Sequence, residues 1–390
     1  MKGKIKGIIF LSTLFFLTLI ISCAGNKDNN DEANNPVEKK VKEVIRIPHD
    51  TLLTNIAKYI AGIECSDTNL IKLQDKIFYK THRNFTDTAW LNIKDSTLTP
   101  LKAWLKNNNF VDEGDTTTLY YPFAGPDFLY AHTFYPKCEN IIMFGLERLG
   151  TVPDFTGMTE NEIAQYLEDI RNSLRYLNYA GYFVTSHMGS DFSKRNLNGN
   201  IHMILYFLAR TNHKIIKVTP VTLDSIGNPM NKTDYNFGNN IRAIKIEYCD
   251  SEAITSKTVY YFSLDVSDEN LASKPQFAMF VNKYSNRVAF FKAASYILFN
   301  PNFKIVKNLA LDCKKIIQDD SGLPYRDLNN DNYDLQMFGT YTRTITQIPW
   351  GYQSDLQEAL EATENNYDLP FKISYNMHYG EGILMCARKK

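Results

Sequence analysis

Residues 118–147 read TLYYPFAGPDFLYAHTFYPKCENIIMFGLE, and this stretch decides the fold class. Residues 118–123 are a β-rich run, residues 124–127 have turn chemistry, and residues 128–135 can form a short helix. Residues 140–147 then form an apolar strand that ends in the carboxylate of Glu147. The order strand, turn, helix, strand is typical of α/β proteins, whose parallel strands are buried on both faces.

The remaining sequence continues this alternation. Residues 158–177 predict the clearest helix, in which Thr159 and Glu162 form a capping box. Residues 371–389 resemble a hairpin that closes through Gly380-Glu381-Gly382. Further strands are expected at 181–187, 214–223, 241–249, 256–266 and 314–318, and further helices at 200–210 and 303–313. We therefore predict an α/β fold with a mixed, largely parallel sheet flanked by helices.

Residues 45–112 predict a helical layer before this sheet. Asp50 is a suitable N-cap for one helix, and Pro100 fits the first turn of another, where a missing N–H costs nothing. Between them, one helical face is expected to carry four apolar side chains: Leu70, Leu73, Ile77 and Phe78. Because we find no linker after residue 45, the helical layer and the α/β domain of residues 113–390 are expected to form one unit.

The first 22 residues have the pattern of a signal peptide. Three lysines precede an apolar run from Ile8 to Ile21, which is too short for the roughly 20 residues of a spanning helix. The end of the run, Ile20-Ile21-Ser22-Cys23, resembles the bacterial lipobox. That resemblance implies cleavage before Cys23 and attachment of a diacylglycerol lipid to its thiol, so a membrane is the expected partner.

Residues 23–44 are expected to be a flexible tether. They contain many Asn and charged residues and almost no apolar side chain, and random-coil statistics give an end-to-end distance of roughly 25 Å. Ala24 stands where enterobacterial lipoproteins retained in the inner membrane commonly have Asp. We therefore expect an outer-membrane lipoprotein, with the leaflet left open.

The charge balance gives no support for binding of nucleic acid. The full chain has 43 basic and 43 acidic residues. Removal of residues 1–22 takes away three lysines and leaves a net charge of −3. A chain without a basic surplus has little with which to neutralise phosphates.

Polar residues follow four predicted strands, and these are the candidate ligand-binding residues. In open α/β sheets ligands bind at the carboxyl ends of the strands. The candidates are Gly125, Asp127, Glu147, Arg148, Ser186, His187, Asp319 and Asp320. Alternatively, Asp127 caps its helix and Asp319 accepts turn amides, as loop carboxylates often do.

An extracytoplasmic hydrolase is the second hypothesis. Its candidate catalytic residues are His187, Asp320, Ser321 and Asp127, which could meet as a Ser/His/Asp arrangement. The sequence contains no GxSxG, HExxH or SxxK motif. The catalytic residues therefore stay unassigned at this level.

Residues 118–147 also resemble the opening of class I methyltransferase-type Rossmann domains. The resemblance implies that Glu147 binds a ribose. The sequence departs from that family at its turn, where Gly125 is a single glycine and Pro126 lacks an amide. A degenerate domain of this type is the less favoured alternative, and we expect no cofactor.

The cysteines and histidines show no metal-ligand spacing, and no metal site is expected. Five cysteines follow Cys23, and they are expected to be mostly buried free thiols, although up to two disulfides are open. His202 lies in an apolar helix and is expected to be a hydrogen-bonded core residue.

The stretches YPFAGPDFLYA and IIQDDSGLPYR resemble a bacterial envelope protein family to which we attach no activity. The favoured hypothesis is therefore a lipid-anchored protein that binds a polar ligand, an envelope protein or a glycan at the strand-end cleft. Whether it is an enzyme is left open.

Overall fold

The structure, a computed structural model, describes residues 46–108, 118–180, 197–363, 369–375 and 381–390. All of them belong to one compact unit, Val44–Lys390. The helical residues at the start of this unit pack on the rest of it, as expected for a single unit. Helix α1 (Thr51–Ile60) packs on α8 (Ile201–Arg210), and α3 (Ile77–Ile93) packs on α6 (Glu160–Ala180).

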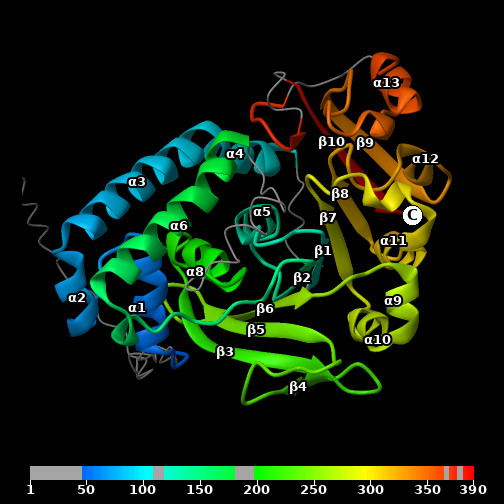
Figure 1. Cartoon of the computed structure of the whole chain (residues 1–390). Helices are drawn as coiled ribbons and strands as arrows, with labels where there is room; N and C mark the ends of the chain where they lie inside the picture. The colour runs from blue at the N-terminus through cyan, green and yellow to red at the C-terminus, as the bar shows by residue number, and fades with distance from the viewer. Residues whose placement is uncertain (1–45, 109–117, 181–196, 364–368, 376–380) are drawn as a thin grey trace, which may run out of the picture. The chain divides into compact units, whose positions relative to one another are not determined.

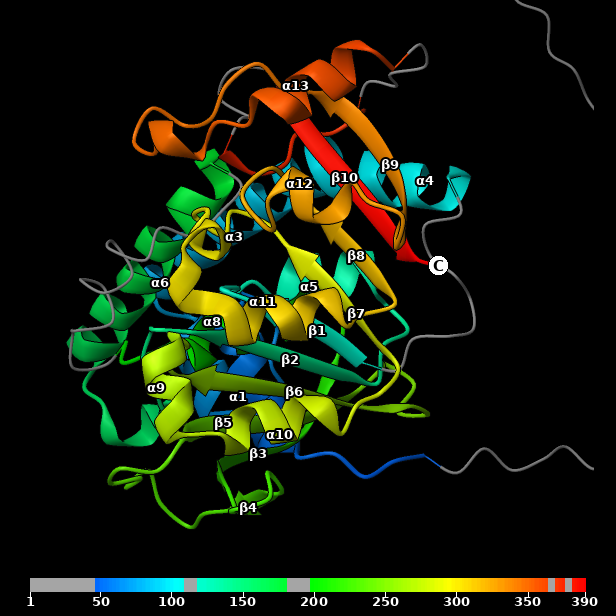
Figure 2. The same cartoon turned by 90° about the vertical axis from the view of Figure 1, so that its right-hand side faces the viewer.

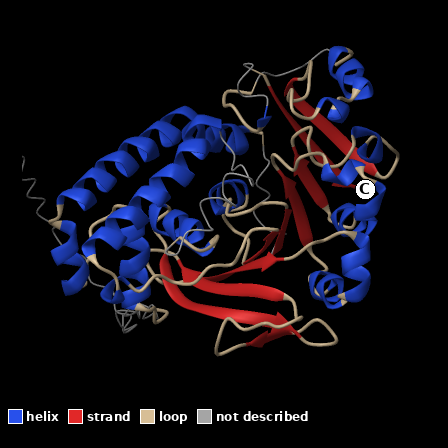
Figure 3. Ribbon diagram, viewed as in Figure 1, coloured by secondary structure: helices blue, strands red, loops and turns tan. Residues whose placement is uncertain are grey.

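The described residues form one ten-stranded sheet with helices on both faces (Figures 1 and 3). The strand order is β4-β3-β5-β6-β2-β1-β7-β8-β10-β9. Their bounds are β1 Thr118–Pro122, β2 Asn140–Gly145, β3 Lys214–Leu223, β4 Pro229–Asn231, β5 Arg242–Cys249, β6 Ser256–Ser263, β7 Arg287–Phe291, β8 Lys315–Gln318, β9 Tyr333–Thr340 and β10 Gly382–Lys389.

The five central strands, β6-β2-β1-β7-β8, are parallel, and the outer pairings are antiparallel. This confirms the α/β class with a mixed sheet, although the parallel strands fill its centre rather than most of its width. From β1 the chain builds β2 and then β6 on one side, and later β7 and β8 on the other. The order therefore reverses between β1 and β7, which is the topological switch point of the sheet.

Each face of the sheet has its own hydrophobic core. Side chains alternate between the faces along a strand, so Leu119 and Tyr121 of β1 join one core and Tyr120 joins the other. The first core includes α1, α6, α8, α4 (Thr99–Asn107) and α5 (Phe128–Phe134). The second is covered by α9 (Asp268–Ser273), α10 (Gln276–Asn282) and α11 (Lys304–Leu311), which face the viewer in Figure 2.

Two capping predictions are confirmed. The Asp50 carboxylate accepts a hydrogen bond from the Leu53 amide at 2.9 Å and caps α1. Thr159 and Glu162 form the reciprocal capping box, with Thr159 N to Glu162 Oε2 at 2.9 Å and Glu162 N to Thr159 Oγ1 at 3.3 Å. These side chains satisfy amides that have no partner inside the helix.

The predicted continuous helical face from Leu70 to Phe78 is wrong. The chain breaks into α2 (Thr68–Gln74) and α3 because Lys76 is extended, with φ −72° and ψ 147°. Gln74 uses its amide to bind the Ile63 carbonyl and the Tyr79 hydroxyl, each at or below 3.0 Å. The break leaves Ile77 78% exposed.

The predicted tail hairpin is also wrong. Residues 369–375 contain no strand, and β10 instead lies between β8 and β9, antiparallel to both. An apolar strand buried on both faces needs hydrogen-bond partners along both edges, and this position supplies them. The remaining short helices, α12 (Tyr325–Leu328) and α13 (Ser354–Glu361), precede and follow β9.

The five cysteines after Cys23 are free, and all except Cys65 are buried, as expected for a domain of this size. His202 is a hydrogen-bonded core residue, also as expected. Its Nδ1 lies 2.9 Å from the Tyr166 hydroxyl, and its Nε2 lies 3.0 Å from Asn198 Oδ1. None of the helices that the structure describes has the length and apolar character needed to cross a membrane.

Candidate functional site

Three of the four predicted polar strand ends lie on the same edge of the sheet. The turn with Gly125 and Asp127 follows β1, Glu147 and Arg148 follow β2, and Asp319 to Ser321 follow β8. These strands are parallel members of the central block, so their carboxyl ends share one edge. The fourth end, with Ser186 and His187, lies outside the described residues.

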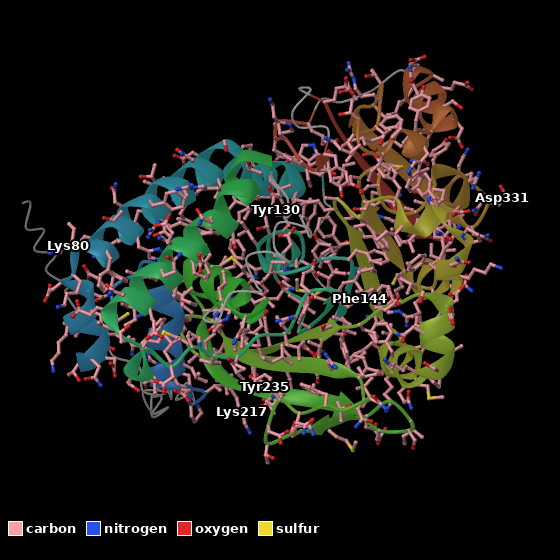
Figure 4. All side chains as sticks on the ribbon, in the orientation of Figure 1. Lys80, Tyr130, Phe144, Lys217, Tyr235 and Asp331 are labelled. Carbon is pink, nitrogen blue, oxygen red and sulfur yellow. The ribbon has the colours of Figure 1, made fainter. Side chains whose placement is uncertain are left out.

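A buried ion pair occupies the switch point of the sheet. Lys292, directly after β7, places its Nζ 2.6 Å from Asp127 Oδ2, and both side chains are at most 4% exposed. The same carboxylate oxygen accepts a hydrogen bond from the Tyr121 hydroxyl at 3.0 Å. The ammonium group also lies 4.1 Å from the centroid of the Tyr130 ring, which is labelled beside α5 in Figure 4.

The second carboxylate oxygen of Asp127 caps α5, because Oδ1 accepts from the Tyr130 amide at 3.3 Å. The alternative structural role considered for Asp127 is thus present, together with a charge contact that the sequence did not predict. Residues at a topological switch point normally line a crevice for a ligand. Here the protein's own lysine and aspartate lie between the two strands.

The loop after β7 is strained and is held by the β8 loop. Ala293, Ser295 and Tyr296 have φ values of 54° to 56°, a conformation that costs roughly 1–3 kcal/mol at a non-glycine residue. Asp319 Oδ2 accepts from the Ala293 amide at 2.6 Å, and Ser321 Oγ accepts from the Ala294 amide at 2.7 Å. These bonds hold the backbone in the strained conformation.

Ser321 and Asp319 are therefore parts of this loop scaffold. The Ser321 hydroxyl donates to Asp319 Oδ1 at 2.5 Å, and Ser321 is fully buried. The Ser321 amide donates to the same oxygen at 2.8 Å, which is the turn role considered for Asp319. In this arrangement the hydroxyl of Ser321 has a structural role.

Asp319 and Asp320 are two neighbouring buried aspartates, and Asp320 is the neutral one. Burial raises the pKa of both carboxyls, and the neighbouring Asp319 raises the pKa of Asp320 further, to about 8. Asp319 accepts several N–H and O–H donors, which favour its ionised form, so the proton resides on Asp320. The Tyr296 hydroxyl donates to Asp320 and itself accepts from Thr344 Oγ1 at 2.6 Å.

Glu147 turns back onto its own strand. Its Oε2 accepts from the Tyr261 hydroxyl at 3.2 Å, and a Cβ at Gly145 would lie 2.3 Å from that oxygen. Glu147 is only 9% exposed, whereas the next residue, Arg148, is exposed. The two residues at this strand end thus separate into a buried acid and an accessible cation.

A cavity of about 570 Å³ lies beside Arg148, at the carboxyl ends of β2 and β6. This volume is in the usual range for a small-ligand site. Two guanidinium groups line the cavity, those of Arg148 and Arg242, and its lining contains no acid. The remaining lining residues are Leu149, Gly150, Thr151, Asn198, Tyr235, Asn236, Phe237, Gly238 and Ser263.

The sheet register explains why the two arginines meet. Gly145 of β2 pairs with Ser263 of β6, and Ser263 pairs with Arg242 of β5. Arg148 follows Gly145 by three residues, so the three neighbouring strands bring both guanidinium groups to one hollow. Within the described ranges, no ion pair joins Arg148 or Arg242 to an acidic side chain.

The backbone around Arg148 is fixed by the start of α8. The Arg148 carbonyl accepts from the Asn200 amide at 2.9 Å. A Cβ at Gly199 would lie 2.2 Å from the Gly150 nitrogen, so only glycine permits this close approach. Asn198 adds a hydrogen bond from the Thr151 amide at 2.9 Å. The wall of the cavity is therefore rigid before any ligand binds.

Sequence reasoning missed Lys292, Arg242, Ser263 and Tyr235. The run Arg287–Phe291 was not recognised as a strand, so Lys292 was not placed at a strand end. Arg242 stands at the start of a predicted strand, and only its antiparallel pairing with β6 brings it to the carboxyl edge. The two strands are expected at 241–249 and 256–266, and an antiparallel register between these sequence neighbours would indicate Arg242.

The strands β6-β2-β1-β7-β8 have the doubly wound order of a Rossmann sheet, which bears on the resemblance of residues 118–147 to the class I methyltransferase-type family. The residues do not fit the nucleotide cofactor of that family. The Glu147 carboxylate binds Tyr261, Pro126 removes an amide from the turn, and the ion pair occupies the switch point. The likeness therefore concerns the arrangement of strands alone.

No protein-family profile, no curated protein and no solved structure matches the chain. Among the residues that the structure describes, no group of three or more His, Cys, Asp or Glu side chains is placed to hold a metal ion. The function is therefore argued from the geometry of the cavity.

Asp320 gives a prediction for the pH dependence of stability. Its folded-state pKa of about 8 lies above the ordinary value of 3.8, so the folded chain binds the extra proton and loses stability as pH rises toward 8. The buried histidines, whose pKa values are lowered to about 3 or 4, act in the opposite sense only below about pH 6.5. Between pH 7 and 8.5 we expect the free energy of unfolding to fall by up to about 1.4 kcal/mol per pH unit.

Asp320→Asn tests this expectation, because the neutral amide still accepts the Tyr296 hydrogen bond. Urea unfolding of this variant should lose most of this slope between pH 7 and 8, whereas above pH 8 all variants lose stability because burial also raises the pKa of the Cys65, Cys249 and Cys313 thiols. Asp331→Asn, at an exposed position labelled in Figure 4, should retain the slope of the unmodified chain. Equal slopes for all three proteins would contradict the assignment of the proton to Asp320.

Proposed function

We propose that this protein is a lipid-anchored protein of the cell envelope that binds an anionic ligand in the cavity between Arg148 and Arg242. The observation that carries the proposal is the pair of guanidinium groups that line one cavity without an acidic partner among the described residues. A protein that exposes two cations in one hollow stabilises an anion there. The site lies at the carboxyl ends of parallel strands, where open α/β sheets bind their ligands.

The chemistry of arginine narrows the ligand to a carboxylate or a phosphate. The planar guanidinium presents two parallel N–H donors that match the oxygens of either group. The hydroxyl group of Ser263 adds neutral hydrogen-bonding capacity to the same hollow, whereas the side chains of Asn198 and Thr151 bond to each other and shape its wall. The proposed ligand is therefore a small polar molecule, or part of a larger one, with at least one negative group.

The chain's own charge supports a local rather than a general attraction for anions. From Cys23 onward the net charge is −3, so the protein as a whole repels anions weakly. Two cations in one cavity then distinguish this place from the rest of the surface. Binding should weaken with added salt because the arginines are exposed.

The proposed anchor rests on the sequence of the first 23 residues. Lys2, Lys4 and Lys6 precede a short apolar run that ends at Ser22-Cys23, and residues 24–44 separate that cysteine from the folded unit. Two or three acyl chains, at about 0.8 kcal/mol per buried CH₂, suffice to hold a protein on a bilayer. The outer membrane is the proposed location.

The hydrolase alternative gains no support from the candidates that are described. Ser321 and Asp319 hold the strained loop after β7, and Asp320 is 1% exposed. Asp127 is committed to Lys292 and to the cap of α5. We therefore prefer the binding function.

Arg148→Gln and Arg242→Gln test the binding site. Isothermal titration of the mature chain with glucuronate and with inorganic phosphate should show binding of at least one anion and none of neutral glucose. Each variant should weaken that binding about tenfold or more, since a hydrogen bond to a charged group contributes roughly 1.5–3 kcal/mol. The matched control Arg326→Gln, an exposed arginine outside the cavity, should leave the affinity unchanged. Absence of anion binding, or equal binding by all variants, would overturn the proposal.

Cys23→Ala tests the anchor. In a bacterial host that processes lipoproteins, the unmodified protein should fractionate with the outer membrane and carry the mass of a diacylglycerol on its N-terminal peptide. The Cys23→Ala variant should lose both properties, whereas Cys65→Ala should retain them. An N-terminal peptide without a lipid in the unmodified protein would exclude a lipoprotein.

A further inference from the structure

A second cavity, of about 390 Å³, adjoins the first. The two cavities share Gly238, Arg242 and Ser263, so they are neighbouring parts of one trough along the ends of β5 and β6. Arg242 lies at the junction and faces both. The trough is therefore longer than a single small anion requires.

The second cavity has its own cation. Lys274, at the C-terminal end of α9, lines this cavity together with Asn270 and Ser273 of the same helix. Its ammonium group donates to Asn270 Oδ1 at 3.4 Å, and among the described residues it forms no ion pair. The lining also contains one acid, Asp265, which accepts from the Ser267 amide at 2.9 Å, so the second cavity has two cations, Arg242 and Lys274, against one carboxylate. Cations thus follow one another along the trough in the order Arg148, Arg242, Lys274.

The neutral groups of the trough suit carbohydrate. Tyr235 lines the first cavity and is 37% exposed, so it offers part of a ring face to a ligand. Figure 4 labels it next to β3. Its ring lies 6.5 Å from that of Phe237, which is itself 6% exposed and fixes the loop. Two amide side chains, Asn239 and Asn240, line the second cavity and can bind sugar hydroxyls, whereas that of Asn270 bonds to Lys274 and to the Asp265 carbonyl.

We propose that the two cavities bind one acidic oligosaccharide, with an acidic sugar in each cavity and Arg242 between them. This inference rests on the proposed anion site and extends it to a class of ligand. A chain of acidic sugars presents a carboxylate on each sugar unit, and the trough offers three cations, Arg148, Arg242 and Lys274, along its length. An exposed aromatic ring and several amides bind the sugar rings and hydroxyls between those carboxylates.

The test is isothermal titration of the mature chain with mono-, di- and trigalacturonate. We expect the trimer to bind at least tenfold more tightly than the monomer. Lys274→Met should remove this difference, while the monomer binding that depends on Arg148 persists, because Lys274 lies outside the first cavity. Lys274→Arg should retain the preference for the trimer. Lys217→Met, an exposed lysine on β3, is the matched control and should behave like the unmodified chain.

The outcomes separate this inference from the function on which it rests. If monomer binding depends on Arg148 but the trimer binds no more tightly than the monomer, the proposal of an oligosaccharide ligand is overturned and the anion site is retained. If triglutamate binds as tightly as trigalacturonate, the trough recognises charge alone, and the proposal that its ligand is a carbohydrate is overturned. Loss of all anion binding, or monomer binding that is unaffected by Arg148→Gln, would overturn the anion site itself.

Discussion

The buried ion pair between Asp127 and Lys292 is the contact on which the arrangement of the carboxyl edge depends. It joins the ends of β1 and β7, the two strands between which the order of the sheet reverses. Two charges removed from water at this depth are tolerated only when they meet each other and further polar groups. Tyr121 and the Tyr130 amide and ring supply those groups.

This ion pair occupies the place where open α/β sheets commonly bind a ligand. A doubly wound sheet ordinarily opens a crevice at its switch point, and here that place is filled by side chains of the protein. The adjacent loop after β7 is further fixed by Asp319 and Ser321. Cations without an acidic partner among the described residues are found instead on the β2 side of the switch point, where Arg148 and Arg242 line a cavity. The same sheet thus supplies a closed centre and, at its flank, a hollow lined by two arginines.

The sequence allowed the fold class and many elements to be predicted, because long apolar runs and capping residues act locally. The stretch 118–147 forms its strand, helix and strand as expected, and Asp50 and Thr159 cap their helices. The prediction of a hairpin in the tail is wrong because strand pairing depends on the whole sheet. Strand β10 pairs with β9, some 45 residues earlier, rather than with the residues directly before it. For the same reason, only part of the candidate site could be predicted from the sequence. Strand ends place Arg148 and Asp127, whereas Lys292 follows a strand that the sequence did not predict, and Arg242 reaches the edge only through the antiparallel register of β5 with β6.

The most direct test of this account is a double-mutant cycle on the ion pair, measured by urea unfolding at pH 7. Asp127→Asn keeps the cap of α5 and removes the charge, and Lys292→Met keeps the apolar stem. Each single change should cost about 3–5 kcal/mol, because it leaves one buried charge without its partner. The loss of unfolding free energy in the double variant should be smaller than the sum of the two single losses by about 2 kcal/mol or more. The same cycle on the exposed pair Lys76–Glu160 should give a coupling energy of less than about 1 kcal/mol. Single effects at Asp127 and Lys292 that add to within about 0.5 kcal/mol would contradict a central role for the pair.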